Sequence, residues 1–410
     1  MPSPSLENHC RKGFTLLAVL ALALAPAAHA QVTVSNVRAA QRPGTNLVDI
    51  DYDVSGTPLP LKVTLQVSAD DGSTFGVPAT SLSGAVGFPV TPGPNLRLTW
   101  DAGTDWGGQF SERVRCMIAA DDGPMPEGFA LIPAGSFSMG DAHSASGGGY
   151  SDELPVHMVQ VSAFLMAKYE VTKALWDEVR TWGASHGYPE LPPGGGKAAT
   201  HPVHSINWWA MLQWCNARSQ KDGLTPCYYT DAAQTLVFKT GFNNLDDTMV
   251  KWSANGYRLP TEAEWEKAAR GGLSGKRFPW GDTINHTFAN YYSYGNYSYE
   301  APQNQGHHPA YATGDTPYTS PVGSFAGNGY GLYDMAGNLW ERCWDWYSSS
   351  YYASSPGSNP RGAAEGTYRV VRGGFWDVVA FGCRVSLRDQ DLLGYSNYDM
   401  GFRPARSYGP

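Results

Sequence analysis

The chain has 410 residues, of which 42% are hydrophobic, enough to build two or three domains with apolar cores. Charged residues make up only 16% of the sequence, while glycine, tryptophan and tyrosine are abundant, so the composition excludes a disordered chain and a helical bundle. The net charge of −8 argues against a nucleic-acid-binding protein, which would carry a basic stripe.

The N-terminus is typical of a secretory signal peptide. Arg11 and Lys12 precede an apolar stretch over residues 14–25, and residues 28–30 (AHA) form a small-residue cleavage site. The apolar stretch is about half as long as the roughly 20 residues that a membrane span needs. We therefore expect residues 1–30 to be a signal peptide and the mature bacterial protein to be secreted, periplasmic or on the cell surface.

Cysteine usage leaves the redox state open. Removal of the signal peptide leaves Cys116, Cys215, Cys227, Cys343 and Cys383. Export permits disulfides, but an odd number of cysteines means that at least one thiol stays free or pairs between chains. A bridge between Cys343 and Cys383 is our first expectation, and the sequence alone does not fix the connectivity.

Residues 31–122 are predicted to form an all-β module. Apolar and polar residues alternate over residues 48–54 and 61–67, and shorter alternations follow over residues 96–100 and 114–118. Turn-forming residues separate these segments. Several short strands at such spacing indicate an immunoglobulin-like or fibronectin-like sandwich.

One turn of this module resembles an Asp-box hairpin. It spans residues 68–75 (SADDGSTF), with Phe75 where Trp is usual. Its carboxylates are candidate calcium ligands, and the alternative is a hairpin turn stabilised by side-chain-to-backbone bonds. Residues 123–128 then form a predicted linker to a larger domain over residues 129–407.

Three helices are predicted in the larger domain. Thr172, Asn207 and Thr261 are positioned to cap them, and glycines follow each helix at its far end. The signal is clearest at Thr261, because residues 261–264 (TEAE) form a capping box. From residue 272 onward the sequence is rich in Gly, Ser, Asn, Tyr and Trp without a helical period, which predicts long loops.

Four blocks of the larger domain resemble the formylglycine-generating, or sulfatase-modifying factor, family. They are residues 132–140 (IPAGSFSMG), 256–266 (GYRLPTEAEWE), 328–341 (NGYGLYDMAGNLWE) and 372–376 (RGGFW). The resemblance covers about residues 127–406. It implies an α+β domain with a variant of the C-type lectin fold, preceded by the all-β sandwich.

The chain departs from this family at the residues that carry its chemistry. The resemblance implies oxidation of a substrate cysteine to formylglycine by molecular oxygen and copper held by two thiolates, the soft ligands that Cu(I) selects. Between Gly374 and Gly401 the chain has only Cys383. Aligned with the family on Arg-Gly-Gly, Val378 occupies the position of the first family cysteine and Cys383 falls near the second, whereas an alignment on the spacing of Arg384 and Arg388 loses both positions. We expect no copper site and no catalytic residue, unless the chain is an oxidase that uses Cys383.

A second departure is Arg342. The family usually has an aromatic residue at this position, directly after the Trp-Glu pair of the third block. We expect the exchange to alter packing without bearing on copper chemistry.

The resemblance also implies structural calcium as a cofactor. Calcium takes oxygen ligands, and the turn of the third block offers side chains and main-chain carbonyls. The first set of ligands consists of Asp334, Gly337, Leu339 and Glu341. A second set consists of Asn290, Tyr291 and Asp315. The alternative at both places is a turn without a metal.

Residues 375–400 are predicted to form a ligand face. Apolar and aromatic residues are mixed there with acids, without the period of a strand or helix, a composition typical of binding surfaces. Some exported bacterial proteins with this fold are targets of diversity-generating retroelements, which mutate adenines in such a C-terminal stretch. The alternative is ordinary loop sequence over a stable core. The candidate ligand-binding residues are Trp376, Asp377, Val378, Phe381, Leu387, Asp389, Leu392, Tyr395 and Tyr398.

Two functions follow from these features. The first is an exported binding protein whose partner is a protein or a glycan, with neither a nucleic-acid partner nor a membrane span. The second is a formylglycine-generating-type oxidase, or another metal-dependent oxidase, that modifies an exported substrate. The missing second thiol favours the binding protein.

Overall fold

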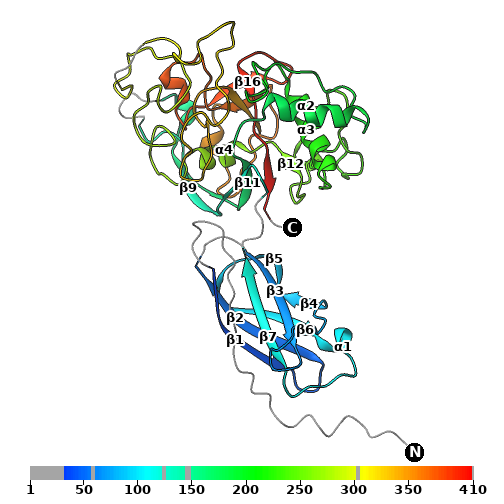
Figure 1. The fold of residues 1–410 in the computed structure, drawn as a ribbon. Helices are drawn as coiled ribbons and strands as arrows, with labels where there is room; N and C mark the ends of the chain where they lie inside the picture. The colour runs from blue at the N-terminus through cyan, green and yellow to red at the C-terminus, as the bar shows by residue number, and fades with distance from the viewer. Residues whose placement is uncertain (1–31, 57–60, 122–125, 144–148, 302–304, 409–410) are drawn as a thin grey trace, which may run out of the picture. The chain divides into compact units, whose positions relative to one another are not determined.

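The computed structural model divides the chain into two compact units, one before Pro126 and one spanning Pro126–Tyr408 (Figure 1). The expected signal peptide and the first part of the expected linker lie outside the described residues. The described ranges are residues 32–56, 61–121, 126–143, 149–301 and 305–408.

The first unit consists of two antiparallel β-sheets (Figure 1), with the strand orders β1-β2-β6-β4 and β5-β3-β7. The alternation in the sequence predicted β2, β3, β6 and β7, and these strands are confirmed. The elements are β1 (Thr33–Gln41), β2 (Leu47–Ser55), β3 (Leu61–Ser68), β4 (Leu82–Gly84), β5 (Gly87–Val90), β6 (Gly93–Asp101), α1 (Ala102–Asp105) and β7 (Arg115–Asp121).

Both sheets contribute to one apolar core. Ile50 and Leu98 come from the first sheet and Val63 and Ile118 from the second, and all four side chains are buried in the same cluster. Alternating side chains on each strand point to opposite faces, which is why the period-2 pattern buries one face. The unit is therefore all-β apart from α1, and its assignment as immunoglobulin-like stays a prediction.

The Asp-box segment forms a tight turn. The Asp70 carboxylate accepts hydrogen bonds from Ser68 Oγ at 2.6 Å and from the Thr74 main-chain nitrogen at 2.8 Å. These bonds, the Ser68 hydroxyl first, lower the pKa of Asp70 to about 2. The carboxylate is thus used within the turn, which favours the hairpin alternative over a calcium loop.

The three predicted helices of the second unit are confirmed. They are α2 (Lys173–Ala184), α3 (Trp208–Lys221) and α4 (Glu262–Ala269) (Figure 1). Thr172, Asn207 and Thr261 cap them as expected, and Thr261 and Glu264 complete the capping box. None of the helices in the described ranges is both long and apolar enough to cross a membrane.

Short strands tie the loops of the second unit together in three sheets. In the sheet β12-β17-β11-β8, the last strand, β17, pairs with β11 from the first part of the unit and with β12 from its middle. A pair, β10-β9, forms a second sheet, and β15-β14-β13-β16 forms the third. The bounds are β8 (Phe129–Ile132), β9 (Gly135–Met139), β10 (His157–Val161), β11 (Phe164–Ala167), β12 (Tyr257–Arg258), β13 (Trp340–Trp346), β14 (Tyr368–Arg372), β15 (Asp389–Leu392), β16 (Met400–Gly401) and β17 (Ala405–Ser407).

The core of the second unit lies around α4 and β13. All eight residues of α4 and all seven of β13 are buried, including charged ones. Trp265 of α4 is fully buried in the main apolar cluster, and its indole Nε1 donates to Glu341 of β13 at 2.8 Å. Because a buried charge is costly without a partner, these carboxylates require buried cations nearby.

Candidate functional site

The predicted ligand face is the segment that leaves β14 and returns at β16. Gly373 and Gly374 have φ values of 95° and 80°, in the left-handed region that glycine adopts without strain. They turn the chain out of β14 at Arg372 into a short 3₁₀ turn at Ala380–Cys383. The segment then pairs β15 with β14, so both of its halves are anchored on the same sheet.

Most of the predicted ligand-binding residues reach the surface. The exposed ones are Asp377, Asp389, Leu392 and Tyr398, and the partly buried ones are Val378, Phe381 and Tyr395. The exposed fractions of Leu392 and Tyr398 are 49% and 41%. The segment therefore presents apolar and acidic groups to solvent instead of burying them in the core.

The structure corrects this set at Trp376 and Leu387, which are both buried. The Trp376 ring packs beneath the face, with ring centroids 5.2 Å from Tyr318 and 5.9 Å from Tyr398. The Trp376 ring therefore lies under the exposed residues of the face and is not exposed itself. No strand or helix period in this segment distinguishes inward from outward side chains, so the sequence could not separate the two kinds.

Framework residues outside the segment complete the face. His307 Nε2 lies 2.6 Å from Asp377 Oδ1, and the Tyr292 main-chain nitrogen donates to Val378 O at 2.9 Å. The Tyr150 ring packs edge-on against Phe381 at 5.0 Å. Sequence reasoning missed these neighbours. Only the tyrosine-rich composition around residue 292 was a signal that could have indicated them.

Buried ion pairs support the segment from below. Arg372 donates to Glu262 at 2.9 Å and to Glu266 at 2.6 Å, which links β14 to α4. Arg388 also donates to Glu262, with its Nε at 2.7 Å. All four side chains are buried. These ion pairs compensate the buried charges and fix the main chain at Arg372, just before the segment, and at Arg388 within it.

The single thiol of the segment does not fit a copper site. Cys383 is fully buried, and burial raises the pKa of its thiol. A Cβ atom placed on Gly374 would lie 3.0 Å from both Cys383 Sγ and Val378 Cγ1, so these two side chains flank the same glycine. A valine methyl group therefore stands beside the thiol, where a copper site would need a second sulfur.

The expected bridge between Cys343 and Cys383 is wrong. All five cysteines of the described residues are free and buried. Cys343 lies on β13 in the cluster around Trp265, whereas Cys383 lies in a separate cluster with Phe278 and Tyr291. The two residues therefore lie in different parts of the core.

We expect a thiol reagent to label none of these five cysteines rapidly in the native protein at mildly alkaline pH. The thiolate is the reactive form, and burial raises the pKa of Cys116 and of Cys227 to about 12. In denaturant without a reductant, all five should react, as counted by mass spectrometry. A shortfall of two labels after unfolding would mean that a disulfide exists.

The turn that the resemblance assigns to calcium contains buried carboxylates. Asp334 accepts a hydrogen bond from the Gly323 main-chain nitrogen at 2.6 Å, while its Oδ1 is buried and has no hydrogen-bond partner within the described residues. Burial raises the pKa of Asp334 to about 6. The main-chain amides of this turn are hydrogen-bonded as well: Gly337 N donates to Gly373 O, and Leu339 N donates to Glu170.

Glu341, the last member of this set, is held by other side chains. Arg403 donates to both carboxylate oxygens of Glu341, at 2.7 and 2.6 Å, and Trp265 donates to one of them. Glu341 is therefore part of a buried ion pair, and its assignment to calcium stays a prediction. Within the part of the chain that the structure describes, no three His, Cys, Asp or Glu side chains form a group that could hold a metal.

The second calcium set is not brought together either. Asn290 is buried beside Gly337, and Tyr291 is buried with its hydroxyl donating to Glu300 at 3.1 Å. Asp315 is exposed, and no hydrogen bond joins it to Asn290 among the described residues. Asn290 Oδ1 is a buried acceptor without a hydrogen-bond partner in these residues.

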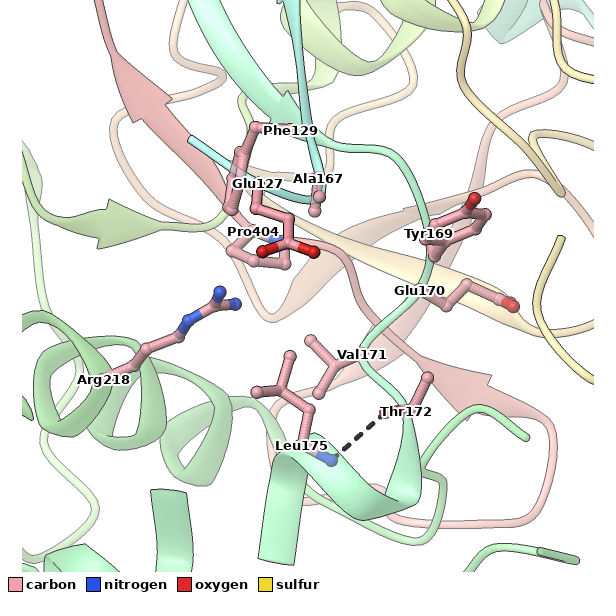
Figure 2. A pocket seen from close by; sticks show the side chains of 11 residues that line it. Glu127, Phe129, Ala167, Tyr169, Glu170, Val171, Thr172, Leu175, Arg218 and Pro404 are labelled. Atoms are coloured by element: carbon pink, nitrogen blue, oxygen red, sulfur yellow. Dashed lines mark hydrogen bonds between the residues drawn. The ribbon is translucent and has the colours of Figure 1, made fainter. Parts of the chain in front are cut away.

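A pocket of about 180 Å³ lies elsewhere in the second unit (Figure 2). Figure 2 shows the Arg218 guanidinium and the Glu127 carboxylate directed toward it, with Leu175 on the apolar wall and the Glu170 side chain directed away. Arg218 lies over the Tyr257 ring at 4.2 Å. Such a pocket can hold a small molecule with an apolar body and a charged group. None of the nine predicted ligand-binding residues lines it.

Comparison with known proteins places this geometry in a family. A model described as a sulfatase-modifying factor enzyme 1-like domain matches residues 117–408. The formylglycine-generating enzyme of Streptomyces coelicolor is 33% identical over 312 residues, which cover 70% of this chain and 93% of that protein. Chaperone protein LppX of Paenibacillus barcinonensis is 34% identical over 283 residues, covering 65% and 87%.

The fold is also similar to that of solved structures. Treponema denticola variable protein 1 superimposes with a TM-score of 0.51 and 30% identity, over 68% of this chain and 94% of that chain. A solved structure of CarF has a TM-score of 0.50 and 24% identity, over 68% and 98%. On these matches, the chain belongs to the sulfatase-modifying factor enzyme 1-like family.

Proposed function

We propose that the protein is an exported binding protein that uses the scaffold of the formylglycine-generating enzymes to present a ligand face. The face consists of residues 375–400, and its ligand is a protein or a glycan. The observation that carries the proposal is the exposure of Asp377, Leu392 and Tyr398 above a buried, ion-paired support. Apolar groups held in solvent beside acids are typical of contact surfaces.

A diversified ligand face is part of this proposal. Its support is the 30% identity with a Treponema protein that is named a variable protein. Export is supported by the basic, apolar and small-residue order of residues 11–30. The immunoglobulin-like assignment of the first unit fits such a protein, because two-sheet modules of this kind occur in many cell-surface proteins.

An oxidase is the second candidate, favoured by the 33% identity with a formylglycine-generating enzyme. The side chains around Cys383 argue against it. Copper would supply oxygen activation in such an enzyme, and the chain offers one buried thiol beside Val378 instead of two thiolates.

Two measurements separate these functions. Purified protein is screened on a glycan array and on a displayed peptide library, and Tyr398→Ala and Asp377→Ala are expected to weaken any binding by about tenfold each, as for residues central to an interface. Phe110→Ala, which removes an exposed aromatic ring of the first unit, is the matched control and should bind normally. In parallel, aldehyde formation on a cysteine-containing sulfatase-motif peptide with copper and oxygen would rule out the binding-only function.

We propose that calcium stabilises the turn at Asp334. Support comes from two buried acceptors without hydrogen-bond partners in the described residues, Asp334 Oδ1 and Asn290 Oδ1. At a free calcium concentration of about 100 times the dissociation constant, binding would stabilise the second unit by about 2–3 kcal/mol. Thermal unfolding in excess Ca²⁺ should therefore occur at a higher temperature than in excess chelator.

Two variants sharpen this calcium test. Asp334→Asn should remove the difference between calcium and chelator, whereas Asp315→Asn changes only the exposed member of the second set. If the wild-type protein unfolds identically in both conditions, the calcium assignment of Asp334 is wrong. If only Asp315→Asn removes the difference, the ion binds at the second set.

A further inference from the structure

We propose that Arg342 is the positioning residue of the ligand face, because it holds the main chain of residues 391–395 through hydrogen bonds to three carbonyl groups. The inference rests on the proposed function, since it explains how the face keeps its shape.

The guanidinium of Arg342 reaches from β13 to the end of β15 and the turn that follows it. Its Nη1 donates to Asp391 O at 3.1 Å, and its Nη2 donates to Leu392 O at 2.9 Å and to Tyr395 O at 3.2 Å. The rigid fork of the guanidinium suits three acceptors in one turn better than a lysine ammonium would. The Arg342 side chain is fully buried, while the side chains of Leu392 and Tyr395 face outward, one exposed and one partly buried.

Arg342 differs from most of the other buried arginines of the unit in its partners. No carboxylate within the described residues lies in ion-pair distance of Arg342; burial lowers the pKa of its guanidinium to about 10, against the attraction of the Asp391 and Asp399 carboxylates. A buried cation without a direct counter-ion is costly, so the three hydrogen bonds to main-chain carbonyls are what compensates its burial at close range. The arginines with a carboxylate partner are Arg258, Arg270, Arg372, Arg384, Arg388 and Arg403.

Three further bonds hold the same stretch by its main chain. Trp208 N donates to Leu393 O at 3.0 Å, Ser205 N to Asn397 O at 2.9 Å, and Trp340 N to Asp399 O at 2.9 Å. Together with the Arg342 bonds, they anchor six carbonyl groups over residues 391–399. Side chains on the outer surface can therefore be exchanged without loss of these anchors, which is what a face with interchangeable residues needs.

Arg369 provides a matched control for Arg342. It is equally buried, and it also lacks an ion-pair partner among the described residues. Its guanidinium donates to Trp344 O and Leu245 O and lies 3.5 Å from the centre of the Trp346 ring. Loss of either arginine removes a buried cation from the same sheet, but only Arg342 donates to the turn.

The test is hydrogen exchange of the Ser205 and Trp208 amides, which report whether the turn stays docked. We expect Arg342→Met to speed the exchange of these two amides by about tenfold or more. Opening of residues 391–395 in this variant no longer requires the three Arg342 hydrogen bonds to break, so its free-energy cost is lower. Arg369→Met should leave these two amides at the wild-type rate, even when it lowers overall stability as much. Leu392→Ala should also leave the rate unchanged.

Arg342→Lys keeps the charge without the fork and gives an intermediate rate if the proposal holds. It also serves as the working variant if Arg342→Met does not fold. Wild-type exchange in the Arg342 variants, or equal acceleration in Arg369→Met, would overturn the positioning role and leave Arg342 as a core residue. The measurement needs no ligand, so its outcome is independent of whether the face binds one.

Discussion

Replacement of Glu262 by glutamine is expected to lower the free energy of unfolding of the second unit by about 3–5 kcal/mol, the range for breaking a buried ion pair. Glu262 accepts hydrogen bonds from Arg372 at 2.9 Å and from Arg388 at 2.7 and 2.9 Å, and all three side chains are at most 3% exposed. Glutamine keeps the volume of the side chain but leaves two buried cations without their shared counter-ion. Urea unfolding of the variant measures the loss.

The control for this prediction is Glu178→Gln. Glu178 pairs with Lys221 at 2.6 Å, but 58% of its side chain is exposed, and exposed pairs contribute about 0–1 kcal/mol. A loss below about 1 kcal/mol for both variants would show that the buried pairs are no more stabilising than surface pairs.

The second large effect is expected for Gly337→Ala, which should cost about 2–5 kcal/mol from left-handed strain and overpacking combined. Gly337 has a φ of 80°, and a Cβ atom there would lie 2.2 Å from Asn290 O, a main-chain atom that cannot rotate away. The methyl group must therefore push the turn away from the main chain at Asn290. The midpoint of urea unfolding reports the change.

Gly331→Ala separates the two causes of this loss. Gly331 has a similar φ of 73° in the same sequence block, but a Cβ atom there would meet nothing within 4 Å. It should show the conformational strain alone, about 1–2 kcal/mol. Equal losses at both glycines would mean that the close approach to Asn290 is not a steric limit.

Local signals predicted the parts of the fold that local chemistry decides. Thr261 and Glu264 form a capping box because both partners lie within one helical turn, so α4 could be placed from the sequence. The strands β2 and β3 follow from the alternation that buries one face of each. Strands β4 and β5 have three and four residues, too few to show a period.

Long-range partners decide the rest, and the sequence carries little trace of them. Glu341 is a predicted calcium ligand, and its ion-pair partner is Arg403, 62 residues further along the chain. Arg342 looked like a packing change, but its acceptors are carbonyl groups about 50 residues away, which any residue type provides. Trp376 lies inside and Tyr398 outside because of how their loops cross the sheet, and loops have no period to reveal it.

The sheet β12-β17-β11-β8 has a consequence for biosynthesis. Strand β17, residues Ala405–Ser407, pairs with both β11 and β12, so these two strands gain this partner only after the last residues of the unit have been made. The first unit has all its strands by residue 121 and can fold while the ribosome is still at work, as domains do from the N-terminus. The second unit therefore completes this sheet only after residues 375–400 have been synthesised.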